Sequence, residues 1–290
     1  MNDVCFFLTG STKIYWVWLF DVTIITIDMV SSIGTPIIRI LILTYLGFGA
    51  YLFFNQRNLL YFPALGDSEA CEVFMKTRAE RIIQNKTTLY YKKNGETIVV
   101  FYHGNGGTAC DRKFLADELD RNNFSYLFVE YAGYADDRET TKENIFQDVQ
   151  NADDFLRTIS YEKLIFVSES LGAGPLAYHT TRRPPEKIAL IAPYAKISDI
   201  VKAHFPYSLY PATLLVKDNF NTTSLDAFRG EVLVIHGTAD EIIPFELGKR
   251  LYESIPSEKK ESLFVSGAMH NTVLDAPGVM EKLLRFFRPE

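Results

Sequence analysis

The serine at position 170 stands in the sequence pattern that most clearly indicates chemistry. Residues 168–172 read SESLG and directly follow the apolar run 164–167, which predicts a buried strand. A buried strand that breaks sharply into a helix, with small residues two positions before and after a serine, exposes that serine as a nucleophile. Ser168 stands where glycine is usual, so the match is imperfect. A nucleophile at Ser168 would put Phe166 at the cramped position, and Ser170 is therefore the preferred candidate.

A serine nucleophile needs a base and a third group that orients the base. Asp240 comes shortly after the apolar run 232–235, and His270 follows the shorter run 262–265. Both residues lie just past a predicted strand, where open α/β sheets bind their ligands. This order and placement predict that Ser170, Asp240 and His270 come together as nucleophile, acid and base.

The same chemistry needs hydrogen-bond donors for the charge that develops on the attacked carbonyl oxygen. The run 98–102 predicts a strand, and the stretch HGNGG follows it at 103–107. Glycines leave the backbone uncovered, so a substrate carbonyl can approach closely. We therefore assign the oxyanion donors to the backbone N–H groups of Asn105 and of Leu171, the residue after the nucleophile.

Each of these residues also has an ordinary structural interpretation. A glycine after a strand is commonly part of a turn, and Ser170 or Asp240 alone fits a capping residue. His270 alone fits a surface histidine. Their joint occurrence on alternating strand and helix patterns favours catalysis. The other histidines are misplaced for the base, and His103 and His236 are expected to be structural because they lie at strand ends.

Further short motifs are spread along the chain: LYFP at 60–63, PY at 193–194, SDI at 198–200, HGT at 236–238 with Pro244 and Phe245, and GA at 267–268 with Asn271. Together with the motifs above, they make residues 55–288 resemble the membrane-anchored α/β-hydrolases. That group includes the bud-emergence-type hydrolases and the α/β-hydrolase-domain depalmitoylases. The resemblance implies an α/β-hydrolase fold and a serine hydrolase of ester or thioester bonds, with Ser170, Asp240 and His270 in the triad.

The chain departs from the family pattern near the expected substrate side. The family's DYRGYG stretch appears here as EYAGYA at 130–135, which contains Tyr134 as a candidate substrate-binding residue. The segment 195–229 predicts a small cap. Four of its side chains are candidates to line the substrate site: His204, Phe205, Tyr207 and Tyr210. Aromatic residues in such a segment also fit a plain hydrophobic core.

Composition limits the remaining possibilities. The chain has 290 residues and a net charge of −6, without a block of lysine and arginine, so nucleic acid is not an expected partner. The three cysteines, Cys5, Cys71 and Cys110, are odd in number and spaced without metal logic. Their odd number argues against a disulfide framework, and their wide spacing argues against a zinc site. The expected reaction requires no cofactor and no metal.

Alternating apolar runs and amphipathic segments predict a mostly parallel central sheet flanked by helices. A helix is expected to open at Asp111 with Arg112 in solvent, and two more are expected around 145–156 and 279–287. Tyr90-Tyr91 and the strand at 97–102, separated by Asn94-Gly95, predict a hairpin at the antiparallel start of the sheet.

The second distinctive feature is the apolar N-terminal sequence. Residues 37–54 contain one charged residue, Arg39, and a membrane-spanning helix needs about 20 apolar residues. We expect a membrane anchor at 37–54, a hydrophobic segment of unassigned role at 1–36 and a catalytic domain at 55–290. A secretory signal and a buried core helix are the alternatives. A small excess of basic residues favours a cytosolic catalytic domain: Arg57, Lys76, Arg78 and Arg81.

The sequence thus predicts a membrane-anchored serine hydrolase whose substrate is an acyl ester or thioester, either a lipid or an acylated protein. One alternative is a membrane-tethered interaction protein that keeps the fold without turnover. Another is a peptidase or carbon–carbon hydrolase, because the same triad supports several reactions.

Overall fold

The computed structural model describes residues 35–63, 68–205 and 210–288. The chain divides into two compact units, residues 1–54 and 55–290. The helix Thr35–Leu60 is long and apolar enough to cross a membrane, by length and composition. The predicted segment 1–36 lies almost entirely outside the described residues.

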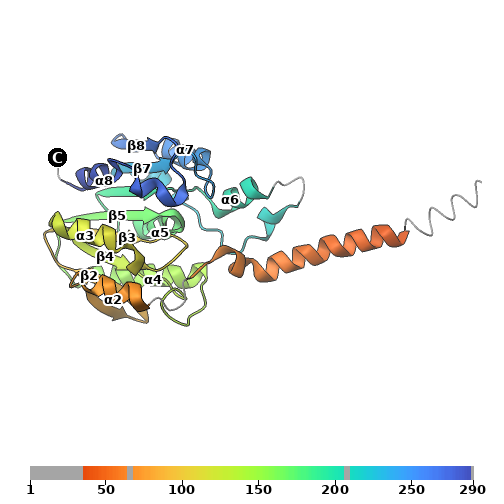
Figure 1. Cartoon of the computed structure of the whole chain (residues 1–290), viewed down its shortest axis with the longest axis horizontal. Helices are drawn as coiled ribbons and strands as arrows, with labels where there is room; N and C mark the ends of the chain where they lie inside the picture. The colour runs from red at the N-terminus through yellow and green to blue at the C-terminus, as the bar shows by residue number, and fades with distance from the viewer. Residues whose placement is uncertain (1–34, 64–67, 206–209, 289–290) are drawn as a thin grey trace, which may run out of the picture. The chain divides into compact units, whose positions relative to one another are not determined.

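The second unit is built on one eight-stranded sheet with the order β1-β2-β4-β3-β5-β6-β7-β8 (Figure 1). The strands are β1 Glu80–Gln84, β2 Thr87–Lys92, β3 Thr97–Tyr102, β4 Ser125–Val129, β5 Lys163–Glu169, β6 Lys187–Ile191, β7 Glu231–Gly237 and β8 Lys260–Val265. All pairs from β4 to β8 are parallel, while β1 and β2 pair antiparallel. The predicted fold class, an α/β-hydrolase sheet flanked by helices, is confirmed.

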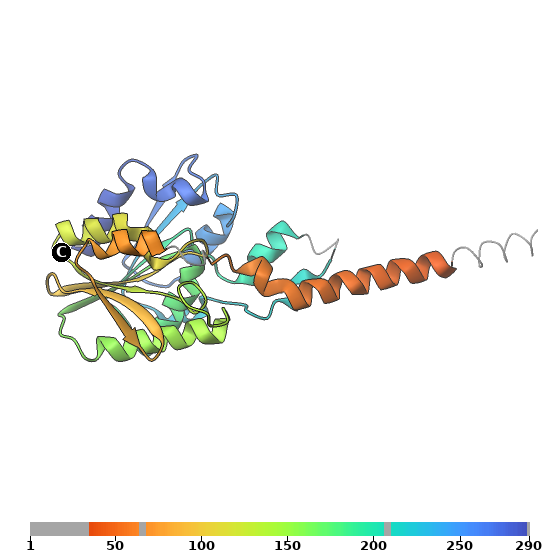
Figure 2. The same cartoon turned by 60° about the horizontal axis from the view of Figure 1, so that its bottom comes forward.

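Helices cover both faces of the sheet because its central strands are apolar on both sides. One hydrophobic core lies under α2 (Ser68–Met75), α3 (Lys113–Arg121) and α8 (Val279–Phe287). The other lies under α4 (Lys142–Leu156), α5 (Ala173–Arg182) and α7 (Phe245–Ser254). Figure 2 shows α2 and α3 on one side of the sheet and α4 on the other. This three-layer arrangement brings the loops after the parallel strands to one edge.

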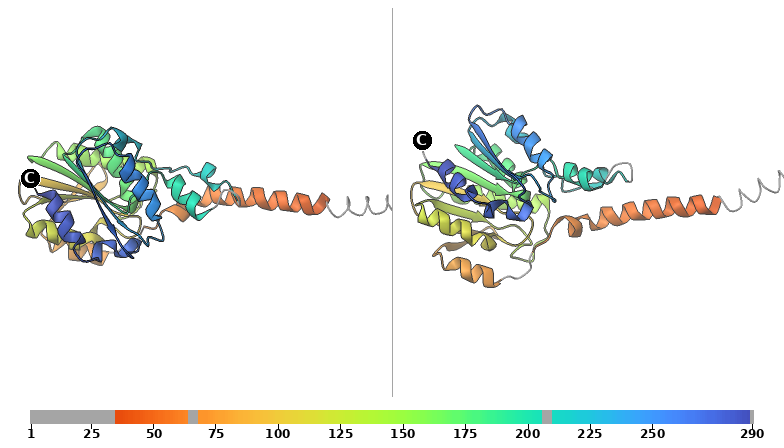
Figure 3. Two further views of the ribbon diagram at one scale, coloured as in Figure 1. Left: turned by 90° about the horizontal axis from the view of Figure 1, so that it is seen from above. Right: turned by 45° about the horizontal axis from the view of Figure 1, so that its top comes forward.

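The described residues of the segment predicted as a cap form short helices. They are α6 (Ile197–His204) and the 3-10 turns η3 (Ala212–Leu215) and η4 (Thr223–Ala227). Helix α6 and η3 pack against each other (Figure 3). The segment follows β6, so it begins at the carboxyl edge of the sheet.

The predicted hairpin between Tyr90-Tyr91 and β3 is wrong. Strand β2 pairs with β1 and β4, and β4 lies between β2 and β3. The connection at Asn94 crosses the end of β4, where the Asn94 N–H donates to the Ser125 hydroxyl at 2.9 Å. Local turn residues indicated a reversal of the chain, but tertiary pairing with β4 decides the partner.

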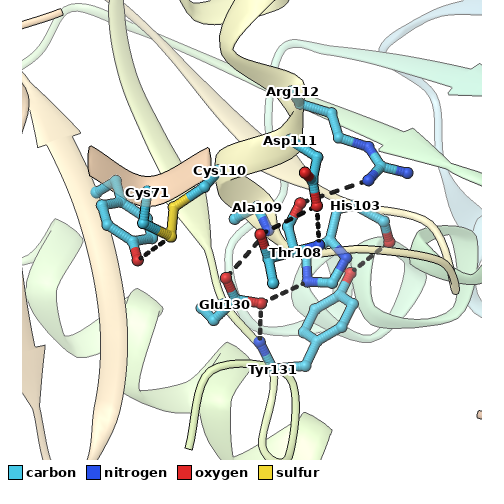
Figure 4. The surroundings of a disulfide bond; sticks show 10 residues. Cys71, His103, Thr108, Ala109, Cys110, Asp111, Arg112, Glu130 and Tyr131 are labelled. Atoms are coloured by element: carbon cyan, nitrogen blue, oxygen red, sulfur yellow. Dashed lines mark hydrogen bonds and ion pairs between the residues drawn. A yellow bond between two sulfur atoms is a disulfide. The ribbon is translucent and has the colours of Figure 1, made fainter. Parts of the chain in front are cut away.

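The expectation that the cysteines form no disulfide is also wrong. Cys71 in α2 is bonded to Cys110 in the 3-10 turn η1 (Ala109–Arg112), which precedes α3 (Figure 4). The two residues are 39 positions apart, and their pairing depends on the packing of α2 against η1. Sequence spacing carries no signal for that packing.

Candidate active site

Ser170 occupies a strained turn between β5 and α5. Its φ of 51° lies in the left-handed region, which a residue with a side chain adopts at a cost. Gly172 is required two residues later, since a Cβ there would lie 2.2 Å from the carbonyl oxygen of Tyr102. Ser168 is fully buried, and its hydroxyl has no hydrogen-bond partner among the described residues. The turn therefore presents Ser170 rather than Ser168.

Ser170, His270 and Asp240 form one hydrogen-bonded row. His270 Nε2 lies 3.0 Å from Ser170 Oγ, and His270 Nδ1 lies 2.7 Å from Asp240 Oδ2. The three side chains come from the loops after β5, β7 and β8, which share the carboxyl edge of the parallel sheet. When Nδ1–H donates to the carboxylate, Nε2 is left to accept the proton of the serine hydroxyl.

Asp240 is held as an anion by its surroundings. Its Oδ1 accepts the backbone N–H groups of Ile242 and Ile243 at 2.9 and 2.7 Å, and its Oδ2 lies 3.1 Å from His236 Nε2. Burial alone raises the pKa of this carboxyl, but the hydrogen bonds from His236, His270 and the backbone lower the pKa well below its usual range. The carboxylate is thereby fixed in position and charge.

The loop after β3 is tied to the chain segment that follows the N-terminal helix. The side chain of Asn105 donates to the carbonyl of Leu60 at 2.6 Å and accepts the Phe62 N–H at 3.2 Å. The Tyr134 hydroxyl donates to the same Asn105 oxygen at 2.8 Å. These three contacts hold the side chain of Asn105, whose backbone N–H is one of the two predicted oxyanion donors. Leu171, the other, has its carbonyl bonded to the Tyr194 hydroxyl at 3.1 Å.

Arg112 braces this loop against the residue before the nucleophile. Its Nε and Nη2 donate to the two carboxylate oxygens of Glu169 at 3.0 and 2.8 Å, and Nη1 donates to the carbonyl of Gly106 at 2.9 Å. Burial raises the pKa of Glu169, but the charge and hydrogen bonds of Arg112 bring that pKa below its ordinary value. The sequence prediction of a solvated Arg112 is therefore wrong. No sequence signal links Arg112 to Glu169, because Arg112 lies in η1 and Glu169 ends β5, 57 positions later.

The histidines expected to be structural are both fully buried. His103 stacks on Tyr131 with 4.0 Å between ring centroids, and its Nε2 lies 3.0 Å from Glu130 Oε1 (Figure 4). His236 Nε2 donates to the carbonyl of Ile243 at 2.9 Å, beside Asp240. Both rings lie at strand ends and support the loops around the row.

The predicted substrate-binding residues have different surroundings. Tyr134 is buried and bonded to Asn105, and burial raises the pKa of its hydroxyl. His204 at the end of α6 is exposed and donates from Nε2 to the carbonyl of Ile242 at 2.8 Å. Phe205 is exposed beside it. Tyr207 lies outside the described residues.

Comparison with known proteins agrees with the α/β-hydrolase fold, although no family model matches the chain. The α/β-hydrolase domain-containing protein 17C of Mus musculus is 30% identical over 209 residues, covering 66% of this chain and 60% of that protein. An uncharacterized protein of Mycobacterium tuberculosis is 24% identical, covering 87% of this chain and 94% of its own. An esterase of Pyrococcus furiosus superposes with a TM-score of 0.62 at 12% identity, covering 79% of this chain and 97% of that one.

These similarities, with the sheet order and the turn at Ser170, establish the class. The chain has the α/β-hydrolase fold, and part of its sequence is similar to an α/β-hydrolase domain-containing protein. The similarity to protein 17C extends over 66% of this chain.

Proposed function

We propose that the chain is a serine hydrolase that cleaves carboxylic ester or thioester bonds through Ser170, His270 and Asp240. The observation that carries this proposal is the hydrogen-bonded row, with 3.0 Å from Ser170 Oγ to His270 Nε2 and 2.7 Å from His270 Nδ1 to Asp240 Oδ2. Both distances lie within reach of proton transfer and orientation.

In the first half-reaction, Ser170 Oγ attacks the acyl carbonyl while His270 Nε2 takes the hydroxyl proton. The Asp240 carboxylate holds the ring and stabilises the imidazolium. The backbone N–H groups of Asn105 and Leu171 receive the oxyanion. When the tetrahedral intermediate collapses, His270 returns the proton to the departing alcohol or thiol, and the acyl group stays on Ser170.

In the second half-reaction, a water molecule gives a proton to His270 and attacks the acyl-enzyme carbonyl. Collapse breaks the bond to Ser170 Oγ, which regains the proton from His270, and a carboxylic acid leaves. Every proton passes through one imidazole, so these residues need no metal or cofactor for the step.

The preferred substrate class is a lipid ester or an acylated protein. The helix Thr35–Leu60 supports this choice, because an anchor of that length would hold the enzyme where such substrates reside. The Pyrococcus neighbour is described as an esterase, and the mouse relative as a hydrolase domain protein. A signal sequence at the same place would instead leave the mature enzyme free of the membrane.

Two features favour opposite sides of the membrane for the catalytic domain. The basic residues after the anchor favour the cytosol, whereas a disulfide such as Cys71–Cys110 persists in oxidising compartments. We propose the oxidising side, since the charge bias rests on few residues. Protease protection of sealed vesicles checks it: a domain digested only from the cytosolic face overturns this assignment.

A fluorophosphonate probe tests the nucleophile. The probe should label the wild-type chain and the Ser168→Ala variant, and Ser170→Ala should lose labelling. Equal labelling of Ser170→Ala would sink the assignment. If well-folded wild-type protein does not label and recovers a stable partner on pull-down, the interaction protein without turnover is the better account.

A series of p-nitrophenyl esters and acyl-thioesters of increasing chain length then tests the substrate class. We expect the highest kcat/KM for long-chain substrates, with Ser170→Ala as the blank. A preference for short chains would contradict a lipid-like substrate, and cleavage of peptides alone would favour a peptidase.

A further inference from the structure

Exposed large hydrophobic side chains gather at one part of the catalytic unit. Among its described residues, six form a set that we call the apolar rim: Leu59, Phe62, Phe205, Leu214, Ile242 and Met269. The other exposed ones are Val73, Ile83 and Phe114. Single exposed apolar residues are ordinary on a protein surface, but a gathered set marks an interaction site.

Three members of the apolar rim adjoin the hydrogen-bonded row and its oxyanion loop directly. Met269 immediately precedes His270. The Ile242 N–H donates to Asp240 Oδ1 at 2.9 Å. The Phe62 N–H donates to the side chain of Asn105 at 3.2 Å. The base, the acid and an oxyanion residue therefore each have an exposed apolar neighbour.

The remaining members join the rim to the cap and to the incoming chain. Phe205 follows His204, whose Nε2 donates to the Ile242 carbonyl. Leu214 lies in η3, which packs against α6, and the next residue accepts a hydrogen bond from Gln56 at 3.0 Å. Leu59 lies in the last turn of the helix Thr35–Leu60. Sequence neighbours, hydrogen bonds and the contact of η3 with α6 thus link the members of the rim to one another.

Leu214 is the clearest sign that this surface has a partner. It is 74% exposed in a short turn, where a polar residue would fit as well and would avoid contact between water and a full apolar side chain. Ile242 is 42% exposed, and its backbone N–H donates to Asp240 Oδ1. Neither Leu214 nor Ile242 belongs to the two hydrophobic cores of the fold.

We propose that the apolar rim seats on a lipid bilayer, so that Ser170 faces the membrane surface. This inference rests on the proposed function, since it names where the acyl substrate comes from. The occupant follows from chain continuity: the rim begins in the helix that is long and apolar enough to span a membrane. Seven residues separate Phe54 from Phe62, so a bilayer holding Phe54 lies within about 30 Å of the rim even along extended chain.

Seating has a direct consequence for substrate transfer. An acyl chain that leaves the bilayer beside Met269 or Ile242 would reach the row without exposing its methylene groups to water. A water-soluble ester gains nothing from the same surface. The rim therefore selects membrane-held acyl groups over soluble ones by their route to the site.

Spin labels measure the depth of the rim directly. We would attach a nitroxide at Leu214→Cys, Ile242→Cys or Glu162→Cys in the full chain carrying Cys5→Ser, reconstituted in phosphatidylcholine vesicles. Glu162 is an exposed control that precedes β5, while Ser170 follows that strand. The seven residues of β5 separate the two by about 23 Å.

Collisions with oxygen, which concentrates in lipid, should exceed collisions with a water-soluble nickel chelate at positions 214 and 242. The order should reverse at position 162. Equal exposure to the nickel chelate at all three positions would overturn the proposal. Protection of 214 and 242 from both reagents would also overturn it, in favour of a protein partner or a second copy on the rim.

The label reports depth whether or not the enzyme turns over, so this outcome is separate from that of the probe experiment. Seated labels in a chain that does not react with fluorophosphonate would sink the hydrolase and keep the docking surface. A chain that reacts with fluorophosphonate but whose rim is exposed to water would keep the hydrolase and overturn the docking surface.

Discussion

His270 Nδ1 and Asp240 Oδ2 lie 2.7 Å apart, although the two residues are 30 positions apart in sequence. The contact fixes which ring nitrogen carries the proton and leaves the other nitrogen facing Ser170. Asp240→Asn should keep the fold but favour the wrong tautomer, and kcat should fall by about 10⁴-fold. Ester hydrolysis by the detergent-solubilised full chain measures this, with the exposed Asp226→Asn as the control. A loss below tenfold would contradict the role of Asp240.

The same carboxylate makes stability depend on pH. Its pKa is lowered by folding, so Asp240 contributes stability that is present above the unfolded pKa of about 4 and is lost as the pH falls. Between about pH 4 and 2, Asp240→Asn should flatten the dependence of the unfolding free energy by up to about 1.4 kcal/mol per pH unit. Urea unfolding followed by circular dichroism at several pH values gives the slope of the unfolding free energy against pH for the wild-type chain and for Asp240→Asn. Parallel slopes would mean that Asp240 is not specially stabilised as an anion.

Arg112 should act as a positioning residue for the oxyanion loop. Arg112→Gln breaks the two-pronged contact with Glu169 and the bond to Gly106. Since one oxyanion donor is worth about 10²–10³ in kcat, misplacing the loop should lower kcat by about 10–100-fold with little change in KM. Arg112→Lys should recover only part of the lost kcat, because an ammonium group cannot donate to both carboxylate oxygens of Glu169 as the guanidinium does.

A matched control for Arg112 is the more exposed Arg121→Gln on α3. It should leave kcat unchanged. If Arg112→Gln instead lowered only the melting temperature, with kcat of the folded fraction intact, Arg112 would be purely structural.

The disulfide should hold α2 to the loop that leads into α3. Replacing both Cys71 and Cys110 by serine should lower the unfolding free energy by about 4 kcal/mol, as expected for a loop of this length. Cys5→Ser should leave it unchanged. A maleimide–polyethylene glycol tag gives an independent count: one tag per unreduced chain and three after reduction. Three tags without reduction would show that the bond does not form in the purified protein.

The fold was predictable because each parallel strand is a short apolar run bounded by polar residues. The proximity of Ser170, Asp240 and His270 was predictable for the same reason, since each lies three to five positions after the end of such a run. The pairing of β2, which contains Tyr90 and Tyr91, with β4 was not predictable. The turn residues Asn94-Gly95 indicate a reversal of the chain, but they do not indicate which strand pairs with β2.

Contacts between distant loops were equally hidden. Arg112 reads as a solvated helix residue, and only the approach of Glu169 gives it a partner. The pairing of Cys71 with Cys110 likewise depends on how two surface elements pack. Periodicity identifies elements and their buried faces, but it carries no information on side chains that meet across loops.

The hydrogen bonds between Asn105 and residues 60 and 62 determine where an N-terminal truncation can begin if a water-soluble form of the protein is wanted. A version beginning at Pro63 would remove those partners and also the contacts of Arg57 and Tyr61 with Asp218. A version beginning at Asn55 would keep them all. The eight residues between those two starting points thus belong to the second unit of the chain, and removing them would take away four of its internal hydrogen bonds.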